Sequence, residues 1–99
     1  MRYAILDSCF PTERQRGRGL GAEYLAWELR RHGLPESEPD SADCLLVTCT
    51  AATDWRYLRS LRKRYPGRII IAGGAAGTSP YSLGLYADVV CVGDGQAFL

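Results

Sequence analysis

The chain contains four short apolar runs, and each is typical of a buried strand. The runs are residues 3–6, 45–47, 69–71 and 89–92. They are continuously apolar instead of alternating with polar residues, which is the pattern of parallel strands covered on both faces. The isoleucine run at 69–71 leads into Gly73, Gly74 and a loop of small residues, so it predicts a strand that ends where side chains have little room.

Helical periodicity appears between the apolar runs. One helix is predicted over residues 20–32, and Gly33 follows it as expected for a left-handed helix end. A second helix is predicted over residues 55–65 and a short third one over residues 79–86. The apolar side chains that recur at helical spacing are Ala22, Leu25, Ala26 and Leu29 in the first helix and Leu58, Leu61 and Tyr65 in the second.

Strands that alternate with helices predict βαβ units, right-handed crossovers and a parallel sheet. We therefore expect residues 1–99 to form a single α/β domain. The expected architecture is a three-layer α/β/α sandwich of the flavodoxin-like or Rossmann-like kind, with a parallel sheet of four or five strands. Residues 34–42 are the candidate for a short edge strand, although Pro39 disfavours one. Thr53 or Asp54 is the predicted N-cap of the second helix.

The candidate binding site is the set of loops that follow the strands, because ligands of such sheets bind beyond the carboxyl ends of the strands. Glycine in these loops permits close approach of backbone to a ligand, although tight turns alone would also account for it. The candidate cofactor-binding residues are Ser8, Cys9, Thr48, Cys49, Thr50, Gly73, Gly74, Ala75, Gly93, Asp94 and Gly95.

The loops carry no complete catalytic motif. His32 is the only histidine and falls at the wrong end of a predicted helix, and the chain has no phosphate-binding loop of the GxxxxGK[ST] type. Cys9 and Cys49 both follow predicted strands, so they are the candidate metal ligands, but two thiolates are too few for a closed zinc or iron–sulfur site. Cys44 and Cys91 are expected in the core.

Charge gives no strong indication of a partner. The formal net charge is +1, and nothing in that total favours a nucleic acid. The second predicted helix has a basic face, which we interpret as solvated, and a nucleic-acid partner, tRNA included, stays open as the alternative. The basic residues are Arg56, Arg59, Arg62, Lys63 and Arg64.

Hydropathy indicates a globular chain outside the membrane. Hydrophobic residues make up 46% of the sequence and charged residues 23%, which is typical of a folded domain. No apolar run approaches the length of a membrane span, and the chain begins directly with a strand pattern instead of a secretory leader. We therefore expect a cytoplasmic protein without a membrane partner, whose cysteines stay reduced.

Four segments together resemble one known domain. Residues 19–33 (GLGAEYLAWELRRHG) resemble the first helix of the N-terminal domain in cobalamin-binding-type radical S-adenosylmethionine enzymes. Residues 69–74 (IIIAGG), Ser79-Pro80 and residues 86–96 (YADVVCVGDGQ) resemble the GG…P…ADxxxxGEGE signature of the same domain. In that family this domain precedes a catalytic barrel that holds a 4Fe-4S cluster and S-adenosylmethionine.

The resemblance implies an accessory cofactor- or substrate-binding domain that is not catalytic alone, since the CxxxCxxC motif of the barrel is absent. It implies cobalamin as the cofactor and the barrel as the partner, in the same or another chain. The chain would then be the N-terminal part of a longer radical S-adenosylmethionine protein.

Two alternatives remain. The chain also resembles the N-terminal domain of methylthiotransferases, whose cysteines follow three of the strands. Cys9 and Cys49 match two of those positions, and Gly74 stands at the third. That resemblance implies an auxiliary iron–sulfur cluster held through Cys9 and Cys49. The other alternative is a non-catalytic protein-interaction module that keeps the fold and has lost its ligand.

Overall fold

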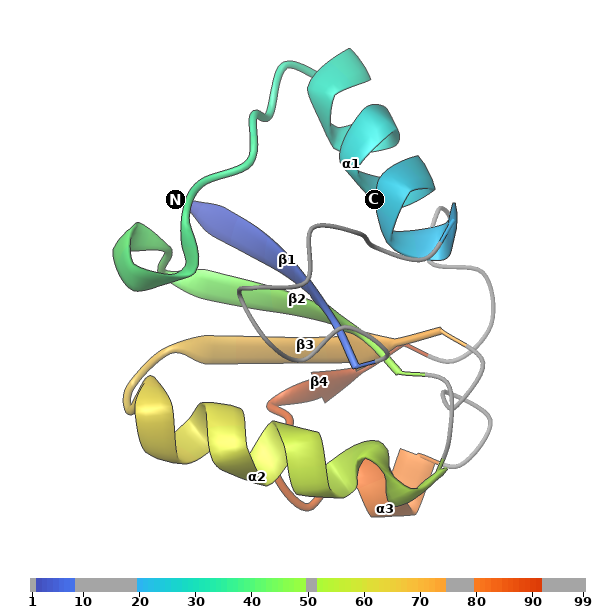
Figure 1. The fold of residues 1–99 in the computed structure, drawn as a ribbon, viewed down its shortest axis with the longest axis vertical. Coiled ribbons are helices and arrows are strands. Elements are labelled where there is room, and N and C mark those ends of the chain that lie inside the picture. Colours follow the sequence, from blue (N-terminus) through green and yellow to red (C-terminus); the bar gives the residue numbers. More distant parts are fainter. Residues whose placement is uncertain (1, 9–19, 50–51, 75–79, 92–99) are drawn as a thin grey trace.

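Four parallel strands form one sheet, and their order across the sheet is β1-β2-β3-β4 (Figure 1). The computed structural model describes residues 2–8, 20–49, 52–74 and 80–91. The predicted parallel α/β class is confirmed for these residues. The strands are β1 (Tyr3–Asp7), β2 (Cys44–Thr48), β3 (Ile69–Gly73) and β4 (Val89–Val90). The helices are α1 (Leu20–Arg31), α2 (Trp55–Arg64) and α3 (Pro80–Leu83), with 3-10 turns η1 (Pro39–Ser41) and η2 (Ala52–Asp54).

Helix α1 covers one face of the sheet. Its small side chains Ala22 and Ala26 are buried, which lets the helix approach the strands closely. The helix ends in a Schellman motif, because the Gly33 N–H donates to the Arg30 carbonyl (3.0 Å) and the Leu34 N–H to the Leu29 carbonyl (2.9 Å). Gly33 has a φ of 76°, so the predicted left-handed helix end is confirmed. The core on this face consists of Tyr3, Ile5, Ala22, Ala26, Leu29 and Cys44.

Helices α2 and α3 cover the opposite face (Figure 1). Successive residues of a strand point to opposite faces, so Leu45 packs toward α2 while its neighbour Cys44 packs toward α1. The predicted apolar stripe of α2 is confirmed, because all three of its residues are buried. The larger core lies here and includes Leu45, Val47, Ile70 and Ala72 from the sheet with Leu58, Leu61, Tyr65 and Leu83 from the helices.

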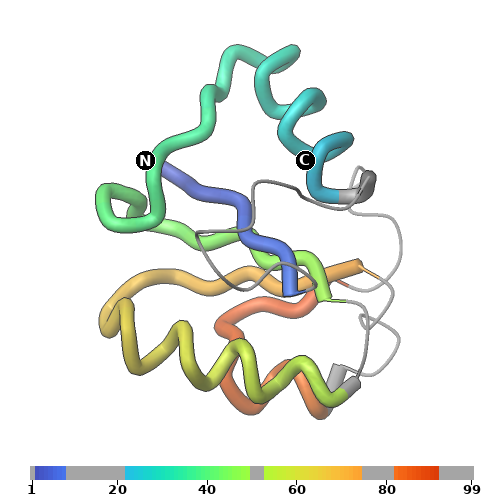
Figure 2. Tube along the Cα trace, viewed as in Figure 1, coloured from blue at the N-terminus to red at the C-terminus, as the bar shows by residue number. Residues whose placement is uncertain are grey.

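Residues 34–38 run along the free edge of β1 without forming a strand. The tube in Figure 2 follows the chain from the end of α1, past the start of β1, to β2. The Ser37 N–H donates to the Tyr3 carbonyl (2.8 Å), and the Tyr3 hydroxyl donates to the Leu34 carbonyl. The predicted edge strand in residues 34–42 is therefore wrong within the described part of the chain: prolines remove ladder donors, and Pro39 begins the turn η1 instead.

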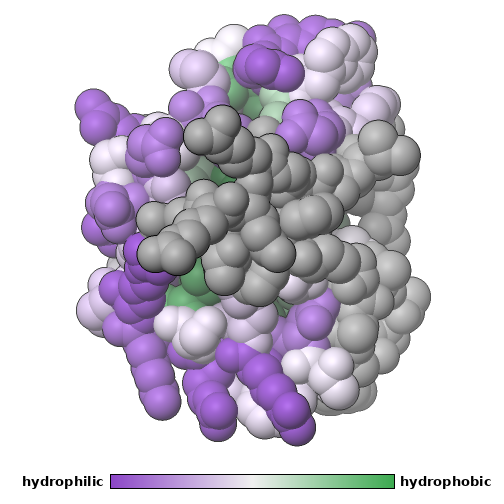
Figure 3. Space-filling view, in the orientation of Figure 1, coloured by the Kyte–Doolittle hydropathy of each residue, from purple (hydrophilic) through white to green (hydrophobic). Residues whose placement is uncertain are grey.

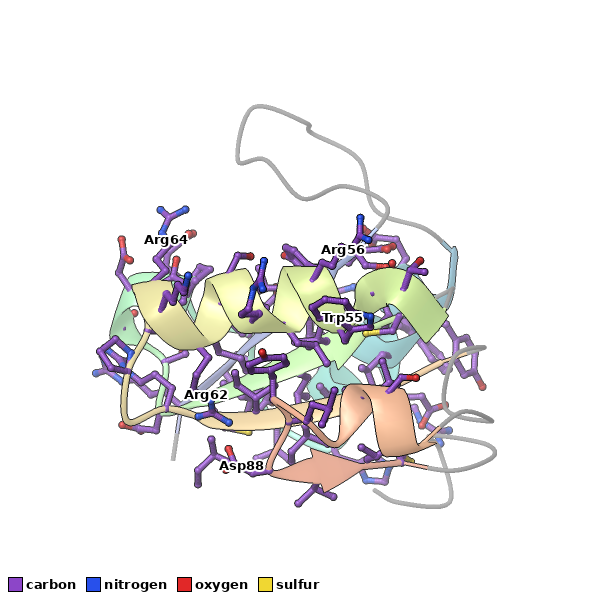
Figure 4. All side chains as sticks on the ribbon, turned by 90° about the horizontal axis from the view of Figure 1, so that it is seen from below. Trp55, Arg56, Arg62, Arg64 and Asp88 are labelled. Carbon is purple, nitrogen blue, oxygen red and sulfur yellow. The ribbon has the colours of Figure 1, made fainter. Side chains whose placement is uncertain are left out.

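Arg62 fastens α2 to the start of β4. Its guanidinium donates to the carbonyls of Tyr86 (2.7 and 3.2 Å) and Arg68 (2.8 Å) and to a carboxylate oxygen of Asp88 (2.9 Å). The same Asp88 oxygen accepts from the Ile70 N–H at 2.8 Å. Figure 4 shows Arg62 pointing from α2 toward Asp88. The interpretation of Arg62 as part of a solvated face is wrong, because it satisfies backbone carbonyls between elements.

Four predicted elements were too long, and the first of them, α1, ends at Arg31 instead of residue 32. Helix α2 ends at Arg64, and Gly67, with a φ of 81°, follows in the turn. Helix α3 ends at Leu83 because Gly84 has a low helix propensity, and the chain then turns. Strand β4 is described only over Val89–Val90. Among the described residues no helix combines the length and the apolar character that a membrane crossing requires.

Candidate functional site

The carboxyl ends of three strands lie in one row. The register pairs Asp7 of β1 with Thr48 of β2, and Thr48 with Gly73 of β3. The helix after β1 goes to one face of the sheet and the helix after β2 goes to the other. The connections after β1 and β2 therefore diverge at the carboxyl ends of these strands, where ligands of α/β sheets bind, although the strand order does not reverse there. The candidate site is therefore the edge between β1 and β2.

A hydroxyl–carboxylate pair lies at this edge. The Ser8 hydroxyl donates to a carboxylate oxygen of Asp54 at 2.7 Å, and the Ser8 N–H donates to the Thr48 carbonyl at 3.0 Å. Ser8 follows β1, whereas Asp54 ends the turn that leads into α2. The pair therefore joins the two diverging connections.

Asp54 does not act as the predicted side-chain cap of α2. It occupies the N-cap position, but its backbone is helical (φ −68°, ψ −4°) and its side chain makes no cap hydrogen bond. The reason is that η2 runs directly into α2, so the first helical turn continues an existing one. The carboxylate turns to Ser8 instead. Sequence reasoning missed this contact, which joins residues 46 positions apart.

Gly73 and Gly74 are explained by packing within the chain. A methyl group on Gly74 would lie 2.7 Å from the Cys49 carbonyl oxygen and 3.2 Å from the Cys49 nitrogen, and the φ of Gly74 is 97°. On Gly73 it would lie 3.2 Å from Cβ of Cys91. The Cys49 N–H donates to the Gly73 carbonyl at 2.7 Å. Contact of either glycine with a ligand stays a prediction.

Cys49 lies beneath the edge as a buried thiol. Its side chain belongs to the larger core. Burial raises the pKa of Cys49 to about 12, and the carboxylates of Asp54 and Asp7 raise it further in the same direction. The metal-binding form of cysteine is the thiolate, so the proton at Cys49 opposes ligation. In the described part of the chain no group of three His, Cys, Asp or Glu could hold a metal ion. These residues do not fit an iron–sulfur cluster.

Tyr57 and Asp7 are two further polar residues close to Cys49. Asp7 is buried at the end of β1, and Tyr57 packs from α2 against the core below it. Burial raises the pKa of Tyr57 to about 12, with smaller contributions from Tyr65, Cys49 and Asp7. Tyr57 therefore keeps its proton at neutral pH and is available as a donor. Its position four residues before Leu61, on the helical period, is the signal that sequence reasoning overlooked.

The structure brings together five of the candidate cofactor-binding residues, namely Ser8, Thr48, Cys49, Gly73 and Gly74. The others, namely Cys9, Thr50, Ala75, Gly93, Asp94 and Gly95, lie outside the described residues. His32 is far along the chain from this edge: it follows α1, and its imidazole lies 3.7 Å from a Glu28 carboxylate oxygen. The described edge residues can therefore hydrogen-bond a ligand, but they offer no imidazole to a metal ion.

Comparison of the chain with protein-family models, with curated proteins and with solved structures finds no match.

Proposed function

We propose that this chain is an accessory ligand-binding domain of a radical S-adenosylmethionine enzyme, with a flavodoxin-like three-layer fold and no catalysis of its own. The observation that carries the proposal is the edge between β1 and β2, where Ser8 and Asp54 meet above the row formed by Asp7 and Thr48. The resemblance of the sequence to the cobalamin-binding-type domain supplies the class of parent enzyme. The partner would be the catalytic barrel, in the same or another chain.

The residues at the edge favour a ligand that is rich in hydrogen-bonding groups. The Ser8 hydroxyl is half-buried and already fixed by Asp54, and Tyr57 offers a protonated hydroxyl nearby. Groups fixed in this way lose little rotational freedom when a ligand binds. The amide side chains and nucleotide tail of cobalamin suit such a surface. Binding would then rest on these contacts, with no protein ligand to cobalt from the described residues.

The direct test is uptake of hydroxocobalamin by the chain, measured by equilibrium dialysis and by the visible spectrum of the bound corrinoid. Loss of one neutral hydrogen bond costs about 1 kcal/mol, which is about a fivefold change in affinity. We therefore expect Ser8→Ala and Asp54→Asn each to weaken binding about fivefold. The matched control is Ser60→Ala, because the Ser60 hydroxyl donates only within its own helix, to the Tyr57 carbonyl at 2.6 Å.

Two results would overturn the proposal. The first is a chain that takes up no hydroxocobalamin at millimolar concentration although its circular dichroism is that of a folded α/β domain. The second is uptake that Ser8→Ala and Ser60→Ala reduce equally, because binding would then lie elsewhere. Anaerobic reconstitution with iron and sulfide tests the cluster alternative. A visible charge-transfer absorption band that requires Cys49 would favour a thiolate-bound cluster over cobalamin.

A further inference from the structure

Helix α2 concentrates positive charge. It carries five of the twelve Lys and Arg residues of the chain and no acidic residue. Arg62 is committed to Asp88, whereas the other four side chains are exposed. In Figure 4 Arg56 and Arg64 project from α2 on the side opposite Arg62, and hydrophilic side chains extend from the lower edge of the molecule in Figure 3, where α2 lies. We define the basic face as Arg56, Arg59, Lys63 and Arg64.

Trp55 holds two of these arginines in place. The guanidinium carbons of Arg56 and Arg59 lie 5.5 and 5.4 Å from the centre of the indole ring. The indole in turn stacks on Tyr86, with ring centres 6.3 Å apart and an angle of 18° between the planes. Within the described residues, Arg56, Arg59 and Lys63 form no ion pair with a carboxylate. Arg56 and Arg59 are therefore ordered by aromatic contacts, and no described carboxylate pairs with either of them.

Helix stability does not explain this arrangement. Cations in the last turn of a helix interact favourably with its dipole, which accounts for Lys63 and Arg64. Arg56 is the second residue of α2, where the dipole disfavours a cation. Arg59 and Lys63 also stand four positions apart, and like charges at that spacing destabilise a helix by about 0.2–0.5 kcal/mol. Neither the helix dipole nor the charge spacing therefore accounts for the amino-terminal half of the basic face, which points to a binding role.

We propose that the basic face of α2 binds the phosphate backbone of a nucleic acid, independently of the ligand site at the sheet edge. Arginine guanidinium groups match the geometry of phosphate oxygens. Arg56 and Arg64 are eight residues apart, which is about 12 Å along a helix at 1.5 Å per residue. A duplex carries one charge per ~1.7 Å, so about seven phosphates fall within that length. Four cations can therefore each meet a phosphate.

The same face is less suited to other polyanions. A membrane surface is bound by cations beside exposed apolar side chains, and the exposed large hydrophobic residues of the described chain all lie outside α2. The faces of Trp55 are occupied by Tyr86 and by the two guanidinium groups. Trp55 is therefore not available to stack on a base, and binding would depend on the phosphate backbone with little sequence preference.

The test is fluorescence anisotropy of a labelled 16-base-pair DNA duplex titrated with the chain at 50–200 mM salt. Four phosphate contacts predict a slope of log affinity against log salt of about −3.6, which is a loss of roughly 150-fold across this range. The variant R56Q/R59Q removes two contacts, so its slope should fall to about −1.8 and its loss to roughly 12-fold. The matched control is R2Q/R30Q, which removes two exposed arginines outside α2.

Further variants test whether binding depends on the charge of the basic face. R56K/R59K retains the charge and should keep a slope near −3.6, whereas Lys63→Gln, which disturbs no described contact, should lower the slope by about 1. The proposal is overturned if R56Q/R59Q and R2Q/R30Q behave alike, or if polyglutamate or phosphatidylserine vesicles bind as tightly as the duplex. None of these changes touches Ser8 or Asp54, so failure here leaves the test of cobalamin uptake unaffected.

Discussion

Replacing Gly74 with alanine tests the geometry at the end of β3. The new methyl group would lie 2.7 Å from the Cys49 carbonyl oxygen, well inside the 3.5–4.0 Å at which non-bonded atoms attract. A left-handed backbone costs a non-glycine residue about 1–2 kcal/mol, and overpacking a tight site costs about 1–3 kcal/mol. We therefore expect Gly74→Ala to lower the free energy of unfolding by about 2–5 kcal/mol, a large part of the stability of a small domain.

Gly67 provides the matched control. Its φ is 81°, close to the 97° of Gly74, but a methyl group there would have no atom within 4 Å. Gly67→Ala therefore meets only the backbone penalty of about 1–2 kcal/mol. Urea unfolding followed by tryptophan fluorescence and far-ultraviolet circular dichroism gives both midpoints, and an unchanged m-value assures that the comparison concerns stability. The difference between the two variants isolates the contact with Cys49.

The reasoning fails if the two variants lose the same free energy, because the Cys49 carbonyl would then not obstruct the methyl group. The reasoning also fails if neither variant is destabilised, since the left-handed backbone would then be absent at both glycines. A loss at Gly74 that exceeds the loss at Gly67 by 1 kcal/mol or more supports the close approach of β3 to the chain after β2.

Three further predictions concern polar groups. Arg62→Met should lower the free energy of unfolding by about 2 kcal/mol, because it leaves the carbonyls of Tyr86 and Arg68 without this donor. Lys63→Met should change the urea midpoint little, and equal effects of the two variants would refute the bridging role of Arg62. Hydrogen bonds from the Ile70 N–H and Arg62 lower the pKa of Asp88, so its contribution to stability is present above about pH 4 and is lost as the pH falls below it. The stability difference between wild type and Asp88→Asn should therefore shrink toward low pH, and a constant difference would contradict this. Cys49, whose pKa is raised to about 12, should resist alkylation by iodoacetamide at pH 8 until the protein unfolds, whereas half-buried Cys91 should react sooner. Mass spectrometry of peptides measures both reactions, and faster alkylation of Cys49 than of Cys91 would contradict the prediction.

Hydrophobic pattern was sufficient to predict the sheet, because strands covered on both faces need unbroken apolar runs. It was insufficient at residues 34–38, where the single backbone bond from Ser37 to Tyr3 depends on the path of the whole connection. It also failed for Arg62. A period of 3.6 places this residue among the cations of α2, and only the tertiary structure brings the carbonyls of Tyr86 and Arg68 within its reach.

The candidate site was likewise predictable only in part from the sequence. Strand ends could be predicted because parallel strands place them at one edge, and the row of Asp7, Thr48 and Gly73 confirms it. The reason for the glycines could not be predicted, since glycine serves equally for ligand approach and for contact between two segments of the chain. The position of Gly74 against Cys49 is a long-range contact that no local pattern encodes.

The two proposed surfaces can be separated by variants because they share no residue. The edge site uses Asp54, which precedes the helix, whereas the basic face uses exposed side chains within it. A chain that binds the DNA duplex with the expected salt dependence and takes up no corrinoid would favour the interaction module over the accessory ligand-binding domain. Corrinoid uptake that depends on Ser8 and is unchanged in R56Q/R59Q would favour the ligand-binding domain. If both activities are found and each is lost only with its own residues, the domain would bind a ligand at the sheet edge and a nucleic acid along α2.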